Sequence, residues 1–143
     1  MFILDNLKNP GVTTQGNTWQ FFTDGVMGGV SSGRAQIEYF ENKKCYRMTG
    51  NVTTENNGGF IQMRVQVKPT IPSNNYTGIY LRTFGNNLIY AIHIRTSYTK
   101  LPWQYYSSKF FAKNKWERIE LPFSNFGQSN FYQPKKFHYS KIK

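Results

Sequence analysis

A run of fifteen residues from Trp19 to Gly33 constrains the fold more than any other stretch of the chain. It reads Trp-Gln-Phe-Phe-Thr-Asp-Gly-Val-Met-Gly-Gly-Val-Ser-Ser-Gly, with four glycines, three aromatic residues and one carboxylate. Glycine has no Cβ, so it can take positive φ in a turn or lie close to a neighbouring strand. We therefore expect the chain to fold back on itself in a structural loop built on four glycines: Gly25, Gly28, Gly29 and Gly33.

Asp24 is the single carboxylate of this glycine loop, and it has two interpretations. Its side chain can accept hydrogen bonds from backbone N–H groups two residues further on, which would make it a structural clasp. Alternatively, Asp24 belongs to a loop that binds a ligand or a partner. A phosphate-binding loop is excluded, because neither G-x-G-x-x-G nor G-x-x-x-x-G-K-[ST] occurs here.

Alternation of apolar and polar residues predicts β-strands along most of the chain. The clearest case is 61–68, where Ile, Met, Val and Val alternate with Gln, Arg, Gln and Lys. Phe, Tyr and Trp make up 17% of the residues, and these types favour strands and fill the space between two sheets. We therefore predict an all-β sandwich in a single domain over residues 1–143. The predicted strands are 2–6, 19–23, 34–41, 45–52, 61–68, 78–84, 88–96, 101–111 and 116–121.

Basic side chains suggest a binding site near the middle of the chain. The asparagine-rich segment 85–87 predicts a hairpin that joins the strands on either side of it. Strand parity would then place Arg82, His93 and Arg95 on one face, with Trp103 nearby. Such a patch would suit a sugar, a phosphate or a carboxylate, and solvated basic side chains are the alternative. A further candidate on the polar face of its own strand is Arg64.

The net charge of +11 is unevenly distributed. No acidic residue occurs between Glu55 and Glu117, and none follows Glu120. This balance favours an anionic partner, such as nucleic acid, anionic lipid head groups or an acidic protein surface. Lysines that are simply solvated are the alternative.

The sequence offers little for catalysis. The two histidines are far apart, and the single cysteine, Cys45, excludes both a Cys-x-x-Cys metal motif and an internal disulfide. Residues 29–33 have the spacing G-x-S-x-G, but no helix-forming run follows Gly33, as a nucleophile elbow would require. We therefore predict a protein that is not an enzyme, with no metal site and no cofactor. No apolar run approaches the roughly eighteen residues of a membrane span, and residues 1–5 are too short for a signal peptide, which predicts a cytoplasmic protein.

Trp19 together with 22–33, Phe-Thr-Asp-Gly-Val-Met-Gly-Gly-Val-Ser-Ser-Gly, resembles the signature of the complex I intermediate-associated protein 30 family. The resemblance implies a jelly-roll like the galactose-binding domains and a role as an assembly factor for respiratory complex I. Its partners would be subunits of that complex, with the protein peripheral to the inner membrane. In relatives further strands follow position 126, so this jelly-roll is expected to lack its last strand or strands and to expose a pairing edge. Later segments of the sequence also resemble the family, in the same order: Gly58-Gly59-Phe60, Tyr76 to Arg82, Tyr90, Arg95-Thr96, Pro102-Trp103, and Trp116 leading to Leu121 to Phe126.

Two further kinds of partner stay open. Jelly-rolls display Trp and Tyr for stacking on sugar rings, so a carbohydrate-binding module is one alternative. The other is an RNA-binding protein, because basic and aromatic residues are interleaved over 76–116. No named RNA-binding motif occurs in the sequence.

Overall fold

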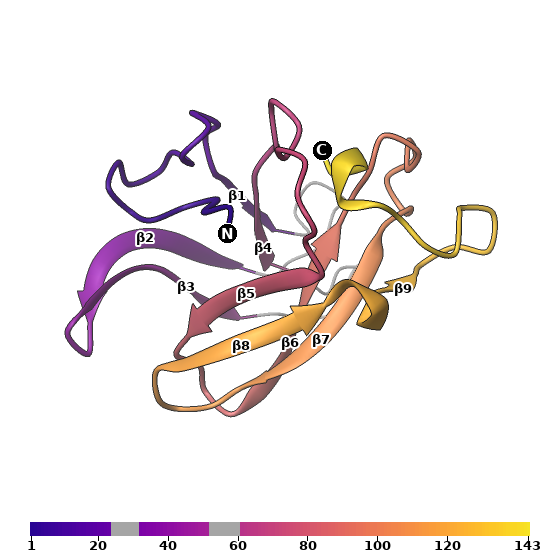
Figure 1. The fold of residues 1–143 in the computed structure, drawn as a ribbon. Helices are drawn as coiled ribbons and strands as arrows, with labels where there is room; N and C mark the ends of the chain where they lie inside the picture. The colour runs from indigo at the N-terminus through magenta and orange to yellow at the C-terminus, as the bar shows by residue number, and fades with distance from the viewer. Residues whose placement is uncertain (24–31, 52–60) are drawn as a thin grey trace. The chain divides into compact units, whose positions relative to one another are not determined.

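The computed structural model describes residues 1–23, 32–51 and 61–143. In these ranges the chain forms nine β-strands and no α-helix, which confirms the all-β prediction (Figure 1). The chain divides into two compact units, Phe2–Pro69 and Thr70–Lys143, and Met1 belongs to the second. The jelly-roll topology and the single domain over 1–143 stay predictions.

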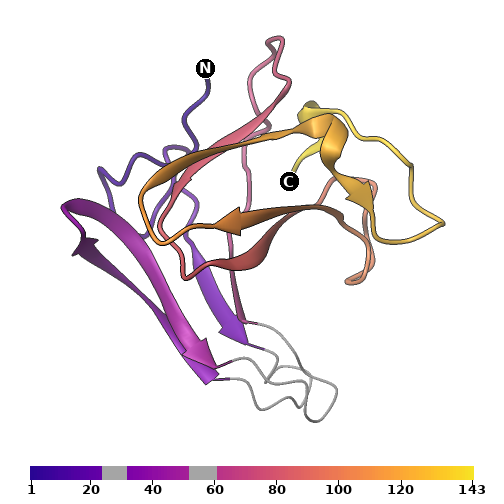
Figure 2. The same cartoon turned by 90° about the horizontal axis from the view of Figure 1, so that it is seen from below.

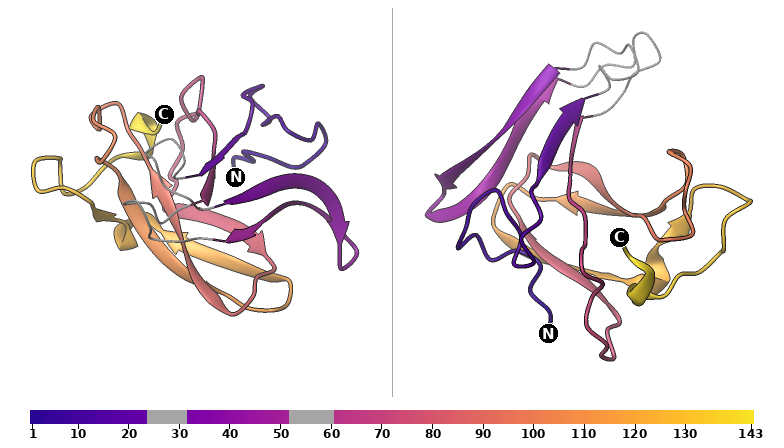
Figure 3. Two further views of the ribbon diagram at one scale, coloured as in Figure 1. Left: turned by 180° about the vertical axis from the view of Figure 1, so that it is seen from behind. Right: turned by 90° about the horizontal axis from the view of Figure 1, so that it is seen from above.

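The first unit contains two antiparallel strand pairs. β1 (Gln20–Thr23) pairs with β4 (Ile61–Arg64), and β2 (Ser32–Phe40) pairs with β3 (Lys43–Asn51). The β2–β3 ribbon is a hairpin (Figure 3). Its two-residue turn has positive φ at both Glu41 and Asn42, 46° and 69°, which matches the right-handed twist of the flanking strands.

Two strand predictions in this unit are wrong. Residues 2–6 form no strand, because Asp5 Oδ1 accepts a hydrogen bond from the backbone N–H of Leu7, 2.7 Å away, and turns the chain there. β4 ends at Arg64 although the alternation continues to residue 68. Its partner strand, β1, has Gln20 opposite Arg64 and extends no further. The N–H of the preceding residue, Trp19, donates to the Gly11 carbonyl at 3.0 Å and not to β4. β4 therefore ends where β1 turns away, although its own alternation of apolar and polar residues continues.

Asp5 also joins three distant parts of this unit. Its Oδ2 accepts hydrogen bonds from Trp19 Nε1 and from the Tyr46 hydroxyl, each at 2.7 Å. The Tyr46 oxygen in turn accepts from the backbone N–H of Gly11 at 3.0 Å. Burial, together with the hydrogen bond to Asp5, raises the pKa of Tyr46 to about 12. One carboxylate thus ties the N-terminal segment to β3 and to Trp19, the residue before β1.

The second unit contains two further antiparallel groups. β5 (Gly78–Thr83) pairs with β8 (Glu117–Pro122), and β7 (Tyr106–Ala112) lies between β6 (Leu88–Ile94) and β9 (Gly127–Gln128). Figure 2 shows the β5–β8 pair and the β6–β7 pair as two layers.

The predicted hairpin at 85–87 is therefore wrong, because β5 and β6 belong to different sheets. This segment is instead a corner that carries the chain from one sheet to the other. The N–H of Gly85 donates to the Lys113 carbonyl and that of Asn87 to the Ala112 carbonyl, each at 2.8 Å. A Cβ on Gly85 would lie 2.2 Å from the Cβ of Ala112, so the corner requires glycine.

Residues 127–143 contribute to the core of the second unit. β9 pairs with the first two residues of β7, and the backbone of Ile142 bridges to Thr96. Phe137 packs against Tyr106 with ring centroids 4.7 Å apart, and the short 3-10 helix η4 (Tyr139–Lys141) begins with a buried residue. This segment therefore supplies both strand pairing and buried side chains.

Candidate functional site

A groove of about 620 Å³ opens over the β5–β8 pair in the second unit. Its lining combines aromatic side chains with a small number of charged and polar groups, which is the usual make-up of a binding site. The polar part includes Arg118, Glu120 and His138. The aromatic part is formed by Tyr76, Tyr80, Phe123, Phe137 and Tyr139.

The charged part of the groove follows from strand register. β5 and β8 pair so that Tyr80 lies opposite Glu120, and side chains of alternate residues share one face. The Arg118 guanidinium lies over the Tyr80 ring, 4.0 Å from its centroid, and Arg118 Nε is 3.2 Å from the Glu120 carboxylate. The side chains of Arg118 and Glu120 are 46% and 70% exposed, so this ion pair contributes at most about 1 kcal/mol. This weak ion pair leaves the Arg118 guanidinium available to another carboxylate.

The aromatic part of the groove is fixed by packing. Tyr139 is buried, and its hydroxyl donates to the Asn74 carbonyl while accepting from the Asn74 N–H at 2.9 Å. The Tyr76 ring meets Tyr139 edge to face, with centroids 5.1 Å apart. Phe123 and Phe137 make a similar contact at 5.5 Å. These rings come from three separate segments of the chain, around residues 76, 123 and 137–139, and their mutual contacts fix their positions.

The predicted basic patch is not assembled on one hairpin. Arg82 is exposed on β5, where it lies opposite Arg118 of β8. His93 lies on β6, opposite Ser107 of β7. Because Arg82 and His93 belong to different sheets, the prediction that they share one face of a hairpin is wrong.

His93 and Arg95 each have a local partner. The His93 ring stacks on Tyr105, with centroids 4.1 Å apart, and desolvation lowers the pKa of this histidine. One guanidinium nitrogen of Arg95 donates to the carbonyls of Thr99 and Leu101, at 3.0 and 2.9 Å. Arg95 therefore braces the loop that follows it.

The other predicted residues are dispersed. Arg64 is exposed, and its guanidinium lies 4.3 Å from the centroid of the Phe22 ring. Trp103 is exposed in the loop before β7. Gly33 lies in β2, where a Cβ would be 2.5 Å from the Thr49 carbonyl oxygen. The remaining members of the predicted glycine loop lie outside the described residues: Asp24, Gly25, Gly28 and Gly29. Binding by any residue of this set stays a prediction.

The sequence pattern did not predict the groove, although it contained part of the information needed to do so. Arg118 and Glu120 alternate with Ile119 and Leu121, which marks a charged face on that strand. Tyr139 could not be found in this way, because its position depends on contacts with Asn74 that are remote in sequence.

The groove is lined by charged and aromatic side chains, and metal ligands do not cluster among the described residues. Within 1–23, 32–51 and 61–143, no three His, Cys, Asp or Glu side chains gather as metal ligands would. In the same ranges no helix is long and apolar enough to cross a membrane. The chemistry available in the groove is cation, carboxylate and aromatic contact.

Comparison with known families identifies the chain. Residues 8–142 match the family described as complex I intermediate-associated protein 30, which is nearly the whole length. The chain belongs to this family. The resemblance of the glycine loop is thereby confirmed, and membership of the complex I intermediate-associated protein 30 family indicates a role related to the assembly of complex I. Comparisons with curated proteins and with solved structures gave no significant match.

Proposed function

We propose that this protein is a non-catalytic assembly factor that binds a protein partner while respiratory complex I is assembled. The groove over β5 and β8 is the proposed binding surface. One observation carries the proposal: an aromatic cluster fixed by packing lies beside an exposed Arg118–Glu120 pair. Family membership supports the choice of complex I as the process.

The groove suits a segment of a protein. An apolar side chain of the partner can enter between the rings, and fixed aromatic side chains are the residues that anchor protein interfaces most strongly. Arg118 can exchange Glu120 for a carboxylate of the partner, since guanidinium and carboxylate groups form two parallel hydrogen bonds. The net charge of +11 favours an acidic segment as the occupant.

A sugar suits this groove less well. Stacking on a sugar requires an open aromatic face, and the Arg118 guanidinium lies over the ring of Tyr80. Trp103 does not line the groove. These contacts favour a protein segment over the carbohydrate-binding alternative.

Photo-crosslinking tests the surface. Benzoylphenylalanine replaces Tyr80 in the groove or, as a control, Tyr39, which is 75% exposed on β2. After irradiation of cells of the source organism, the groove position should crosslink to a complex I subunit or to an assembly intermediate. Equal crosslinking from Tyr39 would remove the groove from the proposal.

A deletion strain tests the process. We expect less assembled complex I on native gels when the gene is deleted, and recovery with the wild-type gene. Arg118→Ala should weaken partner binding by about tenfold or more and restore assembly poorly, because buried arginine contacts dominate many interfaces. Arg34→Ala, at an exposed position of β2, removes the same charge and should restore assembly fully. Normal complex I in the deletion strain would favour the carbohydrate-binding alternative.

A further inference from the structure

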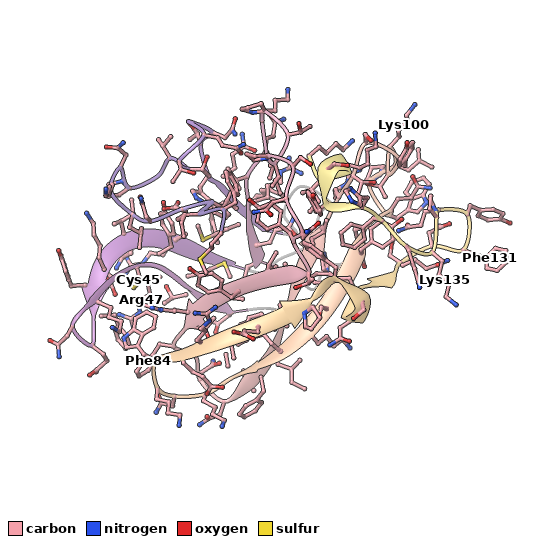
Figure 4. All side chains as sticks on the ribbon, viewed as in Figure 1. Cys45, Arg47, Phe84, Lys100, Phe131 and Lys135 are labelled. Atoms are coloured by element: carbon pink, nitrogen blue, oxygen red, sulfur yellow. The ribbon has the colours of Figure 1, made fainter. Side chains whose placement is uncertain are left out.

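Two loops at one end of the second unit display apolar side chains to solvent (Figure 4). One is 97–105, between β6 and β7, and the other is 129–136, after β9. Phe131 and Tyr132 are 88% and 89% exposed, and Trp103 is 57% exposed. Tyr98 and Leu101 are also exposed. We refer to 97–105 and 129–136 as the aromatic loops.

Hydrogen bonds join the two aromatic loops into one surface. The Ser129 hydroxyl donates to the Trp103 carbonyl at 2.6 Å, and the Ser129 N–H donates to the Tyr105 carbonyl at 2.9 Å. The side-chain amide of Gln133, a buried residue, donates to the same Tyr105 carbonyl at 2.8 Å. Their exposed side chains are therefore presented together by a braced backbone.

Loop 97–105 is also braced from within. Arg95 holds the carbonyls of Thr99 and Leu101, and the fully buried Thr99 hydroxyl donates to the Thr96 carbonyl at 3.0 Å. The N–H of Ser97 donates to the carbonyl of Lys141 at 2.9 Å, so the end of the chain lies against this loop. Hydrogen bonds thus hold loop 97–105 in place, and Trp103 nevertheless stays exposed to solvent.

The aromatic loops and the adjoining end of the chain are basic throughout. Neither loop contains Asp or Glu, and none occurs after Glu120. The exposed lysines on or beside the loops are Lys100, Lys135, Lys136, Lys141 and Lys143. In Figure 4, Lys100, Phe131 and Lys135 lie at the same end of the second unit. The surface therefore combines apolar side chains with uncompensated positive charge.

We propose that the aromatic loops dock on the surface of an anionic lipid bilayer. Phe, Tyr and Trp insert at the boundary between head groups and acyl chains, while lysine stems lie along it with their ammonium groups among the head groups. Each lysine near an anionic leaflet adds attraction. A fluid bilayer accommodates protruding side chains without a complementary shape. This inference concerns a different surface from the groove and does not depend on the proposed function.

Single-stranded nucleic acid fits the same surface less well. Bases bind by stacking on open ring faces, in series along the strand. The ring planes of Phe131 and Tyr132 make an angle of 88°, and their centroids are 5.8 Å apart, so the two rings form no parallel stacking surface. The ammonium group of Lys141 lies 5.9 Å from the centroid of Tyr98 and occupies one side of that ring.

Vesicle sedimentation with the full chain tests the proposal. We expect binding to vesicles of phosphatidylcholine and phosphatidylglycerol in equal parts, weaker binding at high salt, and little binding to pure phosphatidylcholine. Replacing both exposed aromatic residues of loop 129–136, Phe131→Ser with Tyr132→Ser, should lower the partition coefficient about tenfold or more. The double variant Lys135→Gln with Lys136→Gln should lower it by a similar factor. The control, Tyr39→Ser with Lys43→Gln, makes similar changes at exposed positions of the first unit and should leave partition unchanged.

Insertion is measured separately, by quenching of tryptophan fluorescence with brominated lipids. Quenching should be strong for the wild-type protein and largely lost in Trp103→Phe. The proposal is overturned if the loop variants bind vesicles as well as the control does, if Trp103 is not quenched, or if the loops bind oligouridylate in preference to vesicles. Assembly of complex I in cells is a separate measurement, so either proposal can fail alone.

Discussion

The hydrogen-bonded group around Asp5 predicts a large loss of stability from one substitution. Asp5→Ala removes an acceptor that serves Trp19 Nε1, the Tyr46 hydroxyl and the Leu7 N–H, each at 2.7 Å. A hydrogen bond to a charged group contributes about 1.5–3 kcal/mol, and a donor left without a partner adds a penalty. All these groups are half-buried, so water can replace part of what is lost. We expect the free energy of unfolding to fall by about 2–4 kcal/mol.

Urea denaturation of Asp5→Ala measures this loss, with Asn6→Ala as the matched control. Asn6 also accepts a hydrogen bond two residues on, from the Lys8 N–H, but it is exposed and should cost less than about 0.5 kcal/mol. A double-mutant cycle of Asp5→Ala with Tyr46→Phe should give a coupling energy of about 1–2 kcal/mol. If Asp5→Ala unfolds within about 0.5 kcal/mol of wild type, the carboxylate does not hold this unit together.

Titration of Tyr46 offers an independent readout of the same contact. Its pKa is raised to about 12, so this tyrosine contributes stability that is fully present below pH 10 and is lost as the pH rises from 10 to about 12. In Asp5→Ala the pKa should fall, although burial, the larger cause, keeps it above 10. Carbon-13 NMR of labelled tyrosine rings follows this one residue. An unchanged Tyr46 pKa in the variant would contradict the hydrogen bond.

Three further predictions follow from individual contacts in the second unit. Gly85→Ala should cost about 1–3 kcal/mol in urea denaturation, because its Cβ would meet that of Ala112 at 2.2 Å, and Ala112→Gly should recover part of the loss. Tyr139→Phe should cost about 1 kcal/mol in the same assay through the lost hydrogen bonds with Asn74, and no loss would show that the hydroxyl is dispensable. Because desolvation lowers the pKa of His93 below its ordinary value of 6.5, the unfolded chain binds more protons in that window, so stability should fall as the pH drops below 6.5. His93→Gln should flatten this pH dependence, and an identical profile would contradict the desolvation of the ring.

The sequence by itself determined where most strands lie and one of the turns between them. Alternation located β2, β3, β5 and β8 within a few residues, because the side-chain period of two is a local property. The β2–β3 hairpin was predictable for the same reason, since its turn residues decide the pairing of their own flanks. Family membership was likewise readable from a short string, the glycine loop.

Only the tertiary structure decided which strands pair and which residues form the groove. An alternating strand has the same pattern whether it pairs with the next strand or with one much later in the chain. β5 therefore pairs with β8, and segment 85–87, composed like a hairpin turn, forms a corner because Gly85 fits against Ala112. The groove depends on this pairing, which brings Tyr80 beneath Arg118. The contacts of Asp5 in the first unit likewise depend on tertiary structure, since its donors lie 14 and 41 residues away in the sequence.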